Sequence, residues 1–194
     1  MRKFSSSERK EILWISLGGV YQGIFLWYHK KNITHGGMVM EIRFAQAKDV
    51  HGILALLRQV GRVHHEGRAD IFREGAQKYG ASQILAMLDS PATPIFVAVE
   101  EDAVLGYGFC IFKQYKNDPV IADHTEIYID DLCVDENHRG EHIGTAIYHE
   151  ILRYAKGRRC YNVTLNVWSC NPSAMKFYES LGMKPQKIGM ETIL

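Results

Sequence analysis

The feature that most constrains the fold is an alternation between two hydrophobic periods that starts at Glu41 and continues toward the end of the chain. Short runs with a period of two are typical of strands, and longer runs with a period of 3.6 are typical of helices. The expected strands occupy residues 42–44, 95–99, 104–112, 125–134 and 163–167, and one or two more close the chain within 184–194. The expected helices occupy residues 50–60, 82–88, 143–156 and 172–181. This order predicts an α/β (α+β) fold with a mixed sheet flanked by helices.

Polar residues mark where several of these elements begin. Asp49 and Ser82 are placed to cap the first two helices, and Asn171 precedes a proline at the first position of the last helix. The turn at residues 101–103 predicts an antiparallel hairpin between the strands on either side of it. Residues 61–80 are polar and irregular, and neither a repeat nor a linker interrupts residues 40–194. We therefore expect one domain over this range.

Composition excludes several classes of function. The formal net charge of the 194 residues is +1, which lacks the basic excess of proteins that bind nucleic acid. The four cysteines are scattered without a paired or framework spacing, which favours reduced thiols in a cytoplasmic protein. The histidines lack metal-ligand spacing, so no metal site is expected.

Residues 1–39 form an extension that differs from the rest of the chain. An apolar stretch, residues 12–28, lies between basic residues and resembles a short signal anchor, but it is interrupted by glycines and is short for a bilayer span. A second interpretation is that Gly36 and Gly37 are translated from a ribosome-binding site and that the true start is Met40. The codons of the two glycines would test this hypothesis. Of the two, the sequence favours the start at Met40.

The most informative segment is residues 129–146, I-D-D-L-C-V-D-E-N-H-R-G-E-H-I-G-T-A, in which a strand ends, a loop turns and a helix begins. Backbone amides at a helix N-terminus lack intrahelical partners and lie at the positive end of the helix dipole, so they can hold a pyrophosphate. Glycine in such a loop allows phosphate groups to approach the backbone. Taken alone, the pattern also fits an ordinary strand-to-helix connection.

Two motifs together are more specific. The run I-D-D-L-C-V-D-E-N-H-R-G-E-H-I-G-T-A-I at residues 129–147 is followed by N-P-S-A-M-K-F-Y-E-S-L-G-M at residues 171–183. In this order and at this separation they resemble the GNAT superfamily of N-acetyltransferases. The resemblance implies that residues 40–194 are an N-acetyltransferase domain whose sheet is splayed in the middle, with acetyl-CoA as acetyl donor in the split.

The resemblance also implies which residues bind the cofactor. Leu132, Cys133 and Val134 match the strand whose backbone pairs with the pantetheine arm, and Asn171 matches an asparagine that contacts this arm. The residues that match the pyrophosphate loop are Arg139, Gly140, Glu141, His142, Ile143, Gly144 and Thr145. The match is imperfect at His142, where the family usually has glycine. We expect the His142 side chain to point to solvent.

Acetyl transfer to an amine needs a proton donor for the leaving thiolate and a base for the attacking amine. Tyr178 matches the family tyrosine near the thioester sulfur, and a phenol stays protonated at neutral pH. A glutamate that serves as base in some members is replaced by Asn166. The remaining candidates are Glu126, Asp130 and Asp131, of which Glu126 is favoured. Strand alternation predicts that Glu126 and Asp130 share one face and Asp131 takes the other.

The sequence leaves three functions open. The leading one is transfer of an acetyl group from acetyl-CoA to a primary amine of a small molecule or peptide by direct attack, with Cys133 less favoured as a nucleophile. The others are a non-catalytic acetyl-CoA-binding module and a membrane-tethered interaction protein. The acceptor is expected near residues of the irregular segment and two tyrosines: His65, Arg68, Asp70, Phe72, Tyr115 and Tyr128. A homodimer is common among chains of this kind.

Overall fold

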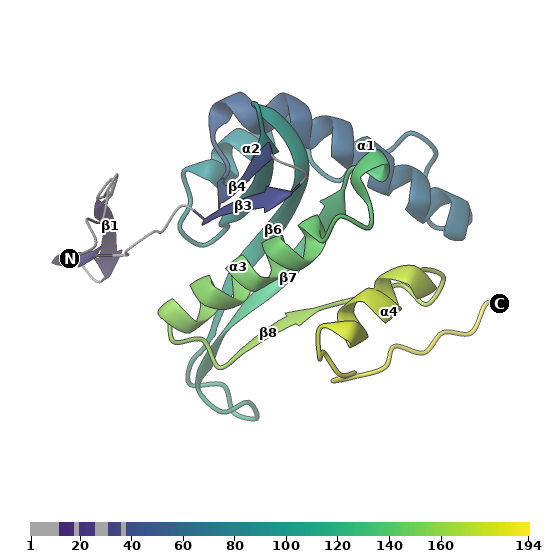
Figure 1. The fold of residues 1–194 in the computed structure, drawn as a ribbon. Helices are drawn as coiled ribbons and strands as arrows, with labels where there is room; N and C mark the ends of the chain where they lie inside the picture. The colour runs from purple at the N-terminus through teal and green to yellow at the C-terminus, as the bar shows by residue number, and fades with distance from the viewer. Residues whose placement is uncertain (1–11, 18–19, 26–30, 36–37) are drawn as a thin grey trace.

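The main sheet has six strands and is mixed. A computed structural model describes residues 12–17, 20–25, 31–35 and 38–194, with side chains from Met40 onward. Its strands are β3 (Lys31–His35), β4 (Met38–Phe44), β5 (Ile95–Glu100), β6 (Ala103–Tyr115), β7 (His124–Val134) and β8 (Asn162–Leu165), in this spatial order (Figure 1). All neighbours are antiparallel except β7 and β8, which are parallel. Strands β1 (Ile12–Leu17) and β2 (Val20–Phe25) form a separate antiparallel pair.

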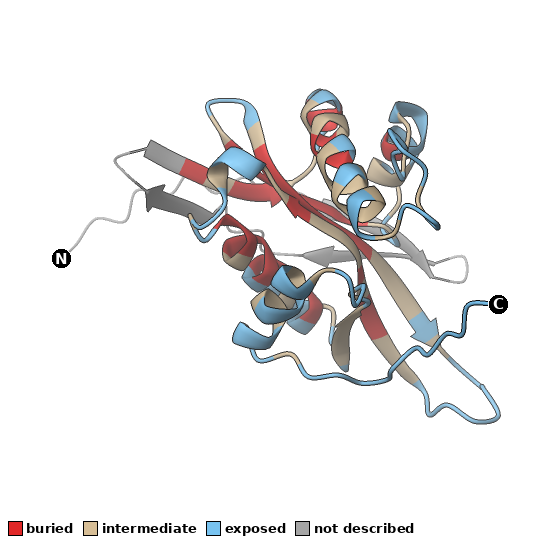
Figure 2. Ribbon diagram, turned by 90° about the vertical axis from the view of Figure 1, so that its right-hand side faces the viewer, coloured by how far each residue is buried: buried red, intermediate tan, exposed pale blue. Residues whose placement is uncertain are grey.

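Helices cover both faces of this sheet, as Figure 2 shows. On one face, α1 (Val50–Gly67) and α2 (Ala81–Leu88) pack over a core of aromatic and aliphatic side chains that includes Ile53, Leu57 and Phe109. On the other face, α3 (Ile143–Gly157) packs over Phe96 and Ile127. Two single-turn helices, η1 (Ala47–Asp49) and η2 (Glu136–His138), precede α1 and α3, and α4 (Pro172–Ser180) follows β8. The predicted mixed α/β fold is confirmed.

Close packing sets the position of α3 over the sheet. Ile147 and Ile151 are fully buried and lie directly over Gly108 of β6. A Cβ atom added at Gly108 would lie 2.9 Å from Cδ1 of Ile151 and 3.0 Å from Cγ2 of Ile147. Burying a side chain of this size contributes about 1.5–3 kcal/mol. The glycine therefore lets the middle of α3 approach the sheet closely.

Helix α1 extends to Gly67, although the sequence predicts its end at residue 60. Gly61 suggests a break, but it lies inside the helix where the segment between α1 and α2 crosses it. A Cβ atom at Gly61 would lie 2.3 Å from the carbonyl oxygen of Ala76. The glycine thus serves the packing of this segment. The predicted cap at Ser82 is also wrong, because α2 starts after Gly80, whose amide donates to the Gln83 side chain at 2.9 Å.

The predicted closing strands are wrong. Residues 184–194 are all described and contain no strand. Their apolar side chains have no buried surface to cover, since Ile188, Met190 and Ile193 are 77–89% exposed. The segment is instead held by an ion pair between Glu191 and Arg68 at the C-terminal end of α1. Residues 184–194 therefore form no strand, because their apolar side chains have no core to pack against.

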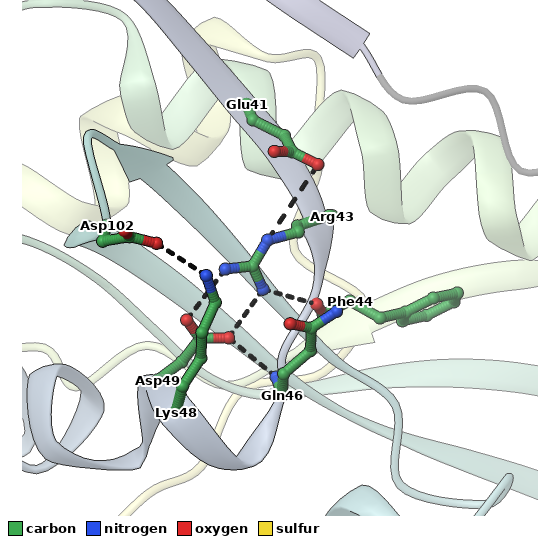
Figure 3. Close-up of polar contacts among 7 residues, drawn as sticks. All are labelled: Glu41, Arg43, Phe44, Gln46, Lys48, Asp49 and Asp102. Atoms are coloured by element: carbon green, nitrogen blue, oxygen red, sulfur yellow. Dashed lines mark hydrogen bonds and ion pairs between the residues drawn. The ribbon is translucent and has the colours of Figure 1, made fainter. Parts of the chain in front are cut away.

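A buried ion pair fixes the connection from β4 to α1 (Figure 3). The Arg43 guanidinium donates to both carboxylate oxygens of Asp49 at 2.6 and 2.8 Å, and to the Phe44 carbonyl at 3.0 Å. Asp49 also accepts from the Gln46 amide at 2.7 Å. Asp49 does occupy the N-cap position of α1, but its carboxylate bonds to these groups and makes no capping bond to that helix.

Candidate functional site

The sheet splits between β7 and β8. These strands pair only from Glu126 with Asn162 to Ile129 with Leu165. Beyond this ladder, residues 130–134 of β7 continue along β6, whereas β8 ends at Leu165. The open part of β7 leads directly to the loop before α3 (Figure 1). The centrally splayed sheet that the two motifs imply is therefore confirmed.

A β-bulge stands at the start of the open segment. Asp131 pairs with Phe109 and Ile129 pairs with Cys110, so Asp130 is an extra residue between them. An extra residue interrupts the alternation of side chains along a strand. Asp130 accepts a hydrogen bond from Tyr79, and Asp131 accepts one from Tyr107. Both tyrosines pack in the core beneath α1 and α2. The prediction that Asp130 and Asp131 lie on opposite faces is wrong.

Two neighbouring residues hold the Asp130 carboxylate. The Tyr79 hydroxyl donates to it at 2.5 Å, and Lys78 Nζ lies 2.7 Å from the same oxygen. Lys78 Nζ also donates to the Asp130 carbonyl at 2.9 Å. Burial and the Asp130 carboxylate raise the pKa of the Tyr79 phenol, so it stays protonated. Sequence reasoning missed Lys78 and Tyr79, because they lie in the segment without periodicity.

The Asp131 carboxylate is less accessible to water than that of an ordinary surface aspartate. Burial raises its pKa from 3.8 to about 6, against the opposing effect of the Tyr107 hydroxyl, which donates to it at 3.0 Å. The same carboxylate, after burial, raises the pKa of the Tyr178 phenol. Its neighbour Phe177 packs at Gly144 beside Val134, which places this part of α4 near the open part of β7. Tyr178 holds its proton there, as a general acid should.

The loop before α3 combines exposed residues with a left-handed backbone. Gly140 has φ of 84° with open space around its Cα, and His142 has φ of 60° at the N-cap of α3. The first helical bond runs from the Ala146 amide to the His142 carbonyl, so the amides of residues 143–145 precede the helical ladder. Arg139 and His142 are exposed. The loop therefore has the exposed cation and forward-facing amides that suit a pyrophosphate.

His142 occupies a conformation that favours glycine, which explains why the family pattern has glycine there. A non-glycine residue in the left-handed region costs about 1–2 kcal/mol. The exposed side chain agrees with the expectation that it points to solvent. Its neighbours Glu141 and Thr145 are half-buried, and Ile143 is buried in the core beneath α3.

Gly144 positions α4 against the start of α3. A Cβ atom at Gly144 would lie 3.1 Å from Cζ of Phe177 and 3.4 Å from Cγ2 of Val134. Glycine at this position therefore leaves room for the Phe177 ring. The sequence alone did not show this packing reason for the glycine. Asn171 caps α4 through its side-chain oxygen, which accepts from the Ala174 amide at 3.1 Å. These contacts place the helix that carries Tyr178.

The matched strand residues divide between the two faces. Leu132 and Val134 pack on the α3 side, while Cys133 is buried on the α1 side with its sulfur 3.7 Å from the Leu56 carbonyl. Burial, followed by the Asp131 carboxylate, raises the pKa of the Cys133 thiol to about 12. A buried protonated thiol is a poor nucleophile.

Glu126 lies in the closed part of the sheet. It is 6% exposed, its carboxylate is 3.2 Å from Lys113 Nζ, and it accepts a hydrogen bond of 3.5 Å from Tyr115. Because β7 still pairs with β8 at this residue, Glu126 is set back from the open segment. Asp130 is the first residue beyond that ladder.

The residues expected around the acceptor lie in three separate places. Phe72 contacts Trp168 edge-to-face at 5.0 Å, and its carbonyl lies 2.7 Å from His65 Nδ1, so this group lies where α1 ends near the loop after β8. In the same region Arg68 pairs with Asp70 and Glu191. Tyr128 instead accepts from the Asn166 side chain at 3.1 Å. Trp168 was not among the predicted residues.

Tyr115 lies in the third place. It stacks on His124 at 4.6 Å in a surface pocket of about 450 Å³ at the hairpin end of β6 and β7. This pocket lies beyond the closed part of the β7–β8 ladder, away from the loop before α3. We therefore do not assign it to the acceptor.

Two further observations concern other kinds of site. Among the described residues, no group of three or more His, Cys, Asp or Glu side chains could hold a metal ion. None of the described helices is both long and apolar enough to cross a membrane. The stretch at residues 12–28 lies partly outside the described residues, and Gly36 and Gly37 lie wholly outside them.

Comparison with known proteins agrees with this arrangement. The model of the acetyltransferase (GNAT) family matches residues 63–183. The thialysine N-epsilon-acetyltransferase of Bos taurus is 28% identical over 153 residues, which are 73% of this chain and 82% of that protein. A mutant of the BH1408 protein from Bacillus halodurans has a TM-score of 0.76 at 34% identity, covering 79% of this chain and 98% of that one. Aminoglycoside N-acetyltransferase AAC(6')-Iy, solved in complex with CoA, has a TM-score of 0.62 at 13% identity over 84% and 99% of the two chains, a likeness of fold.

Proposed function

The chain belongs to the acetyltransferase (GNAT) family, and on that premise we propose that it transfers an acetyl group from acetyl-CoA to a primary amine of a small molecule or peptide. The observation that carries the proposal is the presence of both a base and an acid near the split. Asp130 is the first residue of β7 past its ladder with β8, and protonated Tyr178 lies near the same open segment.

The residues before α3 fit a bound acetyl-CoA. The amides of residues 143–145, with exposed Arg139, would hold the pyrophosphate, and Gly140 leaves open space beside them. The backbone of Leu132 to Val134 and the side chain of Asn171 would hold the pantetheine arm. When bound, this group supplies the acetyl thioester.

Asp130 fits the role of base better than Glu126. A base must reach the attacking amine within hydrogen-bonding distance. Both carboxylates pair with a lysine, but Asp130 lies just past the ladder with β8, whereas Glu126 lies within it. In this scheme Asp130 takes a proton from the acceptor ammonium, the amine attacks the thioester carbonyl, and Tyr178 gives its proton to the leaving thiolate. The nitrogen then loses its second proton, which restores Tyr178, and Asp130 releases the first proton to solvent.

The names of the relatives favour a small alkyl amine as acceptor. The bovine protein is named for acetylation at an N-epsilon position, which is a primary amine at the end of a chain. A small primary amine of this kind would fit the carboxylate pair at Asp130 and Asp131. The four free cysteines agree with a cytoplasmic location, and the homodimer stays a prediction.

The test is calorimetric titration of acetyl-CoA, followed by release of free CoA thiol with a panel of primary amines. We expect binding and amine-dependent release, with Asp130→Asn lowering kcat about 100-fold. Glu126→Gln is the matched comparison. If Glu126→Gln lowers kcat as strongly and Asp130→Asn does not, Glu126 is the base. Binding without amine-dependent release would make the protein a binding module.

A further inference from the structure

The site contains a primary amine of its own. Lys78 Nζ lies 2.7 Å from one Asp130 carboxylate oxygen and 2.9 Å from the Asp130 carbonyl. These are the contacts that an acceptor ammonium would make with the proposed base. Lys78 therefore occupies the place of an acceptor amine relative to Asp130.

The position along β7 brings this amine to the thioester end of the cofactor arm. The arm would run along the backbone from Val134 to Leu132, toward the ladder with β8. With a rise of about 3.3 Å per residue, Asp130 lies about 13 Å along the strand from Val134. The arm thus points its reactive end at the residue that holds Lys78.

The segment that carries Lys78 is docked at the site and still accessible. Its neighbour Tyr79 donates to Asp130 at 2.5 Å and packs against Phe109 with ring centroids 5.1 Å apart. The Lys78 side chain itself is 43% exposed. The backbone is therefore anchored next to Asp130 while the lysine side chain can adjust its reach.

We propose that Lys78 is a site of intramolecular acetylation, an inference that rests on the proposed acetyl transfer. The Lys78 ammonium gives a proton to Asp130, and its nitrogen attacks the thioester carbonyl. A nitrogen–carbon bond forms, the carbon–sulfur bond breaks, and the thiolate leaves with the Tyr178 proton. The nitrogen loses its second proton, which restores Tyr178, and Asp130 releases the first to solvent. The products are Nε-acetyl-Lys78, CoA thiol and one proton.

Another lysine provides a matched comparison. Lys48 Nζ lies 2.6 Å from Asp102, so it has the same kind of partner at a similar distance. Both side chains of that pair are more than half exposed, and Asp102 is in the turn between β5 and β6. Lys48 thus reports chemical acetylation by the thioester in solution, without help from the split.

Acetylation would also change the site. Acetyl-Lys78 carries no positive charge and can no longer pair with Asp130. The carboxylate then becomes available to an external ammonium. We therefore expect amine turnover to rise as Lys78 becomes acetylated.

The experiment incubates the full chain with acetyl-CoA and no added amine, and maps acetyl groups by peptide mass spectrometry over time. We expect Lys78 to be acetylated at least about tenfold faster than Lys48, since proximity accelerates such reactions by more than this. The rate constant should not depend on protein concentration. Asp130→Asn should lower the rate at Lys78 and not at Lys48, and Lys78→Arg should remove the product.

Each other outcome contradicts the inference. Equal rates at Lys78 and Lys48, with normal acetylation of external amines, would overturn the intramolecular reaction and leave the proposed function intact. A rate constant that increases with protein concentration would assign the reaction to a second molecule and also overturn it. Failure to bind acetyl-CoA in a parallel titration would overturn the proposed function and this inference with it.

Discussion

The ion pair between β4 and α1 gives a quantitative prediction for stability. Arg43 is 8% exposed and Asp49 is 2% exposed, and two hydrogen bonds of 2.6 and 2.8 Å join them. Removing one partner of such a pair leaves a buried charge and typically costs 3–5 kcal/mol. Glu41 lies 3.9 Å from the Arg43 guanidinium and would compensate in part. We therefore expect Asp49→Ala to lower the free energy of unfolding by about 3 kcal/mol.

Urea unfolding followed by circular dichroism measures this loss. With a slope of about 2 kcal/mol per molar urea, the midpoint should fall by about 1.5 M. Lys48→Met is the control, because it removes the exposed ion pair with Asp102 next to the same turn and should leave the midpoint near that of the wild type. Arg43→Met combined with Asp49→Ala should cost less than the sum of the single changes. An Asp49→Ala shift no larger than that of Lys48→Met would refute the reasoning.

Three more predictions concern the site. Tyr178→Phe should lower kcat about 100-fold through loss of the general acid, without weakening acetyl-CoA in a calorimetric titration; an unchanged kcat would remove the phenol from the mechanism. Gly144→Ala should destabilise the chain by about 1 kcal/mol, because the new methyl group would lie 3.1 Å from Phe177, and Phe177→Leu should restore part of the loss in urea unfolding. Because folding raises the pKa of Asp131 from 3.8 to about 6, its ionisation destabilises the fold as pH rises through this window. The free energy of unfolding of Asp131→Asn, relative to that of the wild type, should therefore rise by about 3 kcal/mol as the pH increases from below 3.8 to above 6. Parallel pH profiles of the two proteins would contradict this.

The elements whose pattern is local were predictable from the sequence. Helix α3 spans Ile143–Gly157 against a prediction of 143–156, because its apolar residues repeat at helical spacing and a glycine-containing loop precedes it. Asn171 and the following proline likewise fixed the start of α4. The two motifs could then be recognised as a pair, which led to the family.

Features that depend on pairing between distant segments were not predictable. The bulge at Asp130 is defined by its register with β6, and strand alternation alone put Asp131 on the wrong face. Lys78 and Tyr79 reach Asp130 across more than 50 residues of sequence, from a segment without periodicity. Gly61 is a similar case. From the sequence alone a glycine at this position suggests the end of a helix, and only the segment that crosses α1 at Ala76 explains it.

The two carboxylates at Asp130 and Asp131 share one face of the sheet because β7 has one residue more than β6 at the bulge. Deleting one residue between Tyr128 and Asp131 would remove the extra position and restore the regular pleat, so that two neighbouring carboxylates could no longer share one face, while the residues on either side of the deletion would keep their faces. The connection between β6 and β7, residues 116–123, lies outside the paired strands and can change in length without this effect. Among related chains, gaps in an alignment should therefore be frequent in that connection and rare between Tyr128 and Asp131, even where the residues themselves differ.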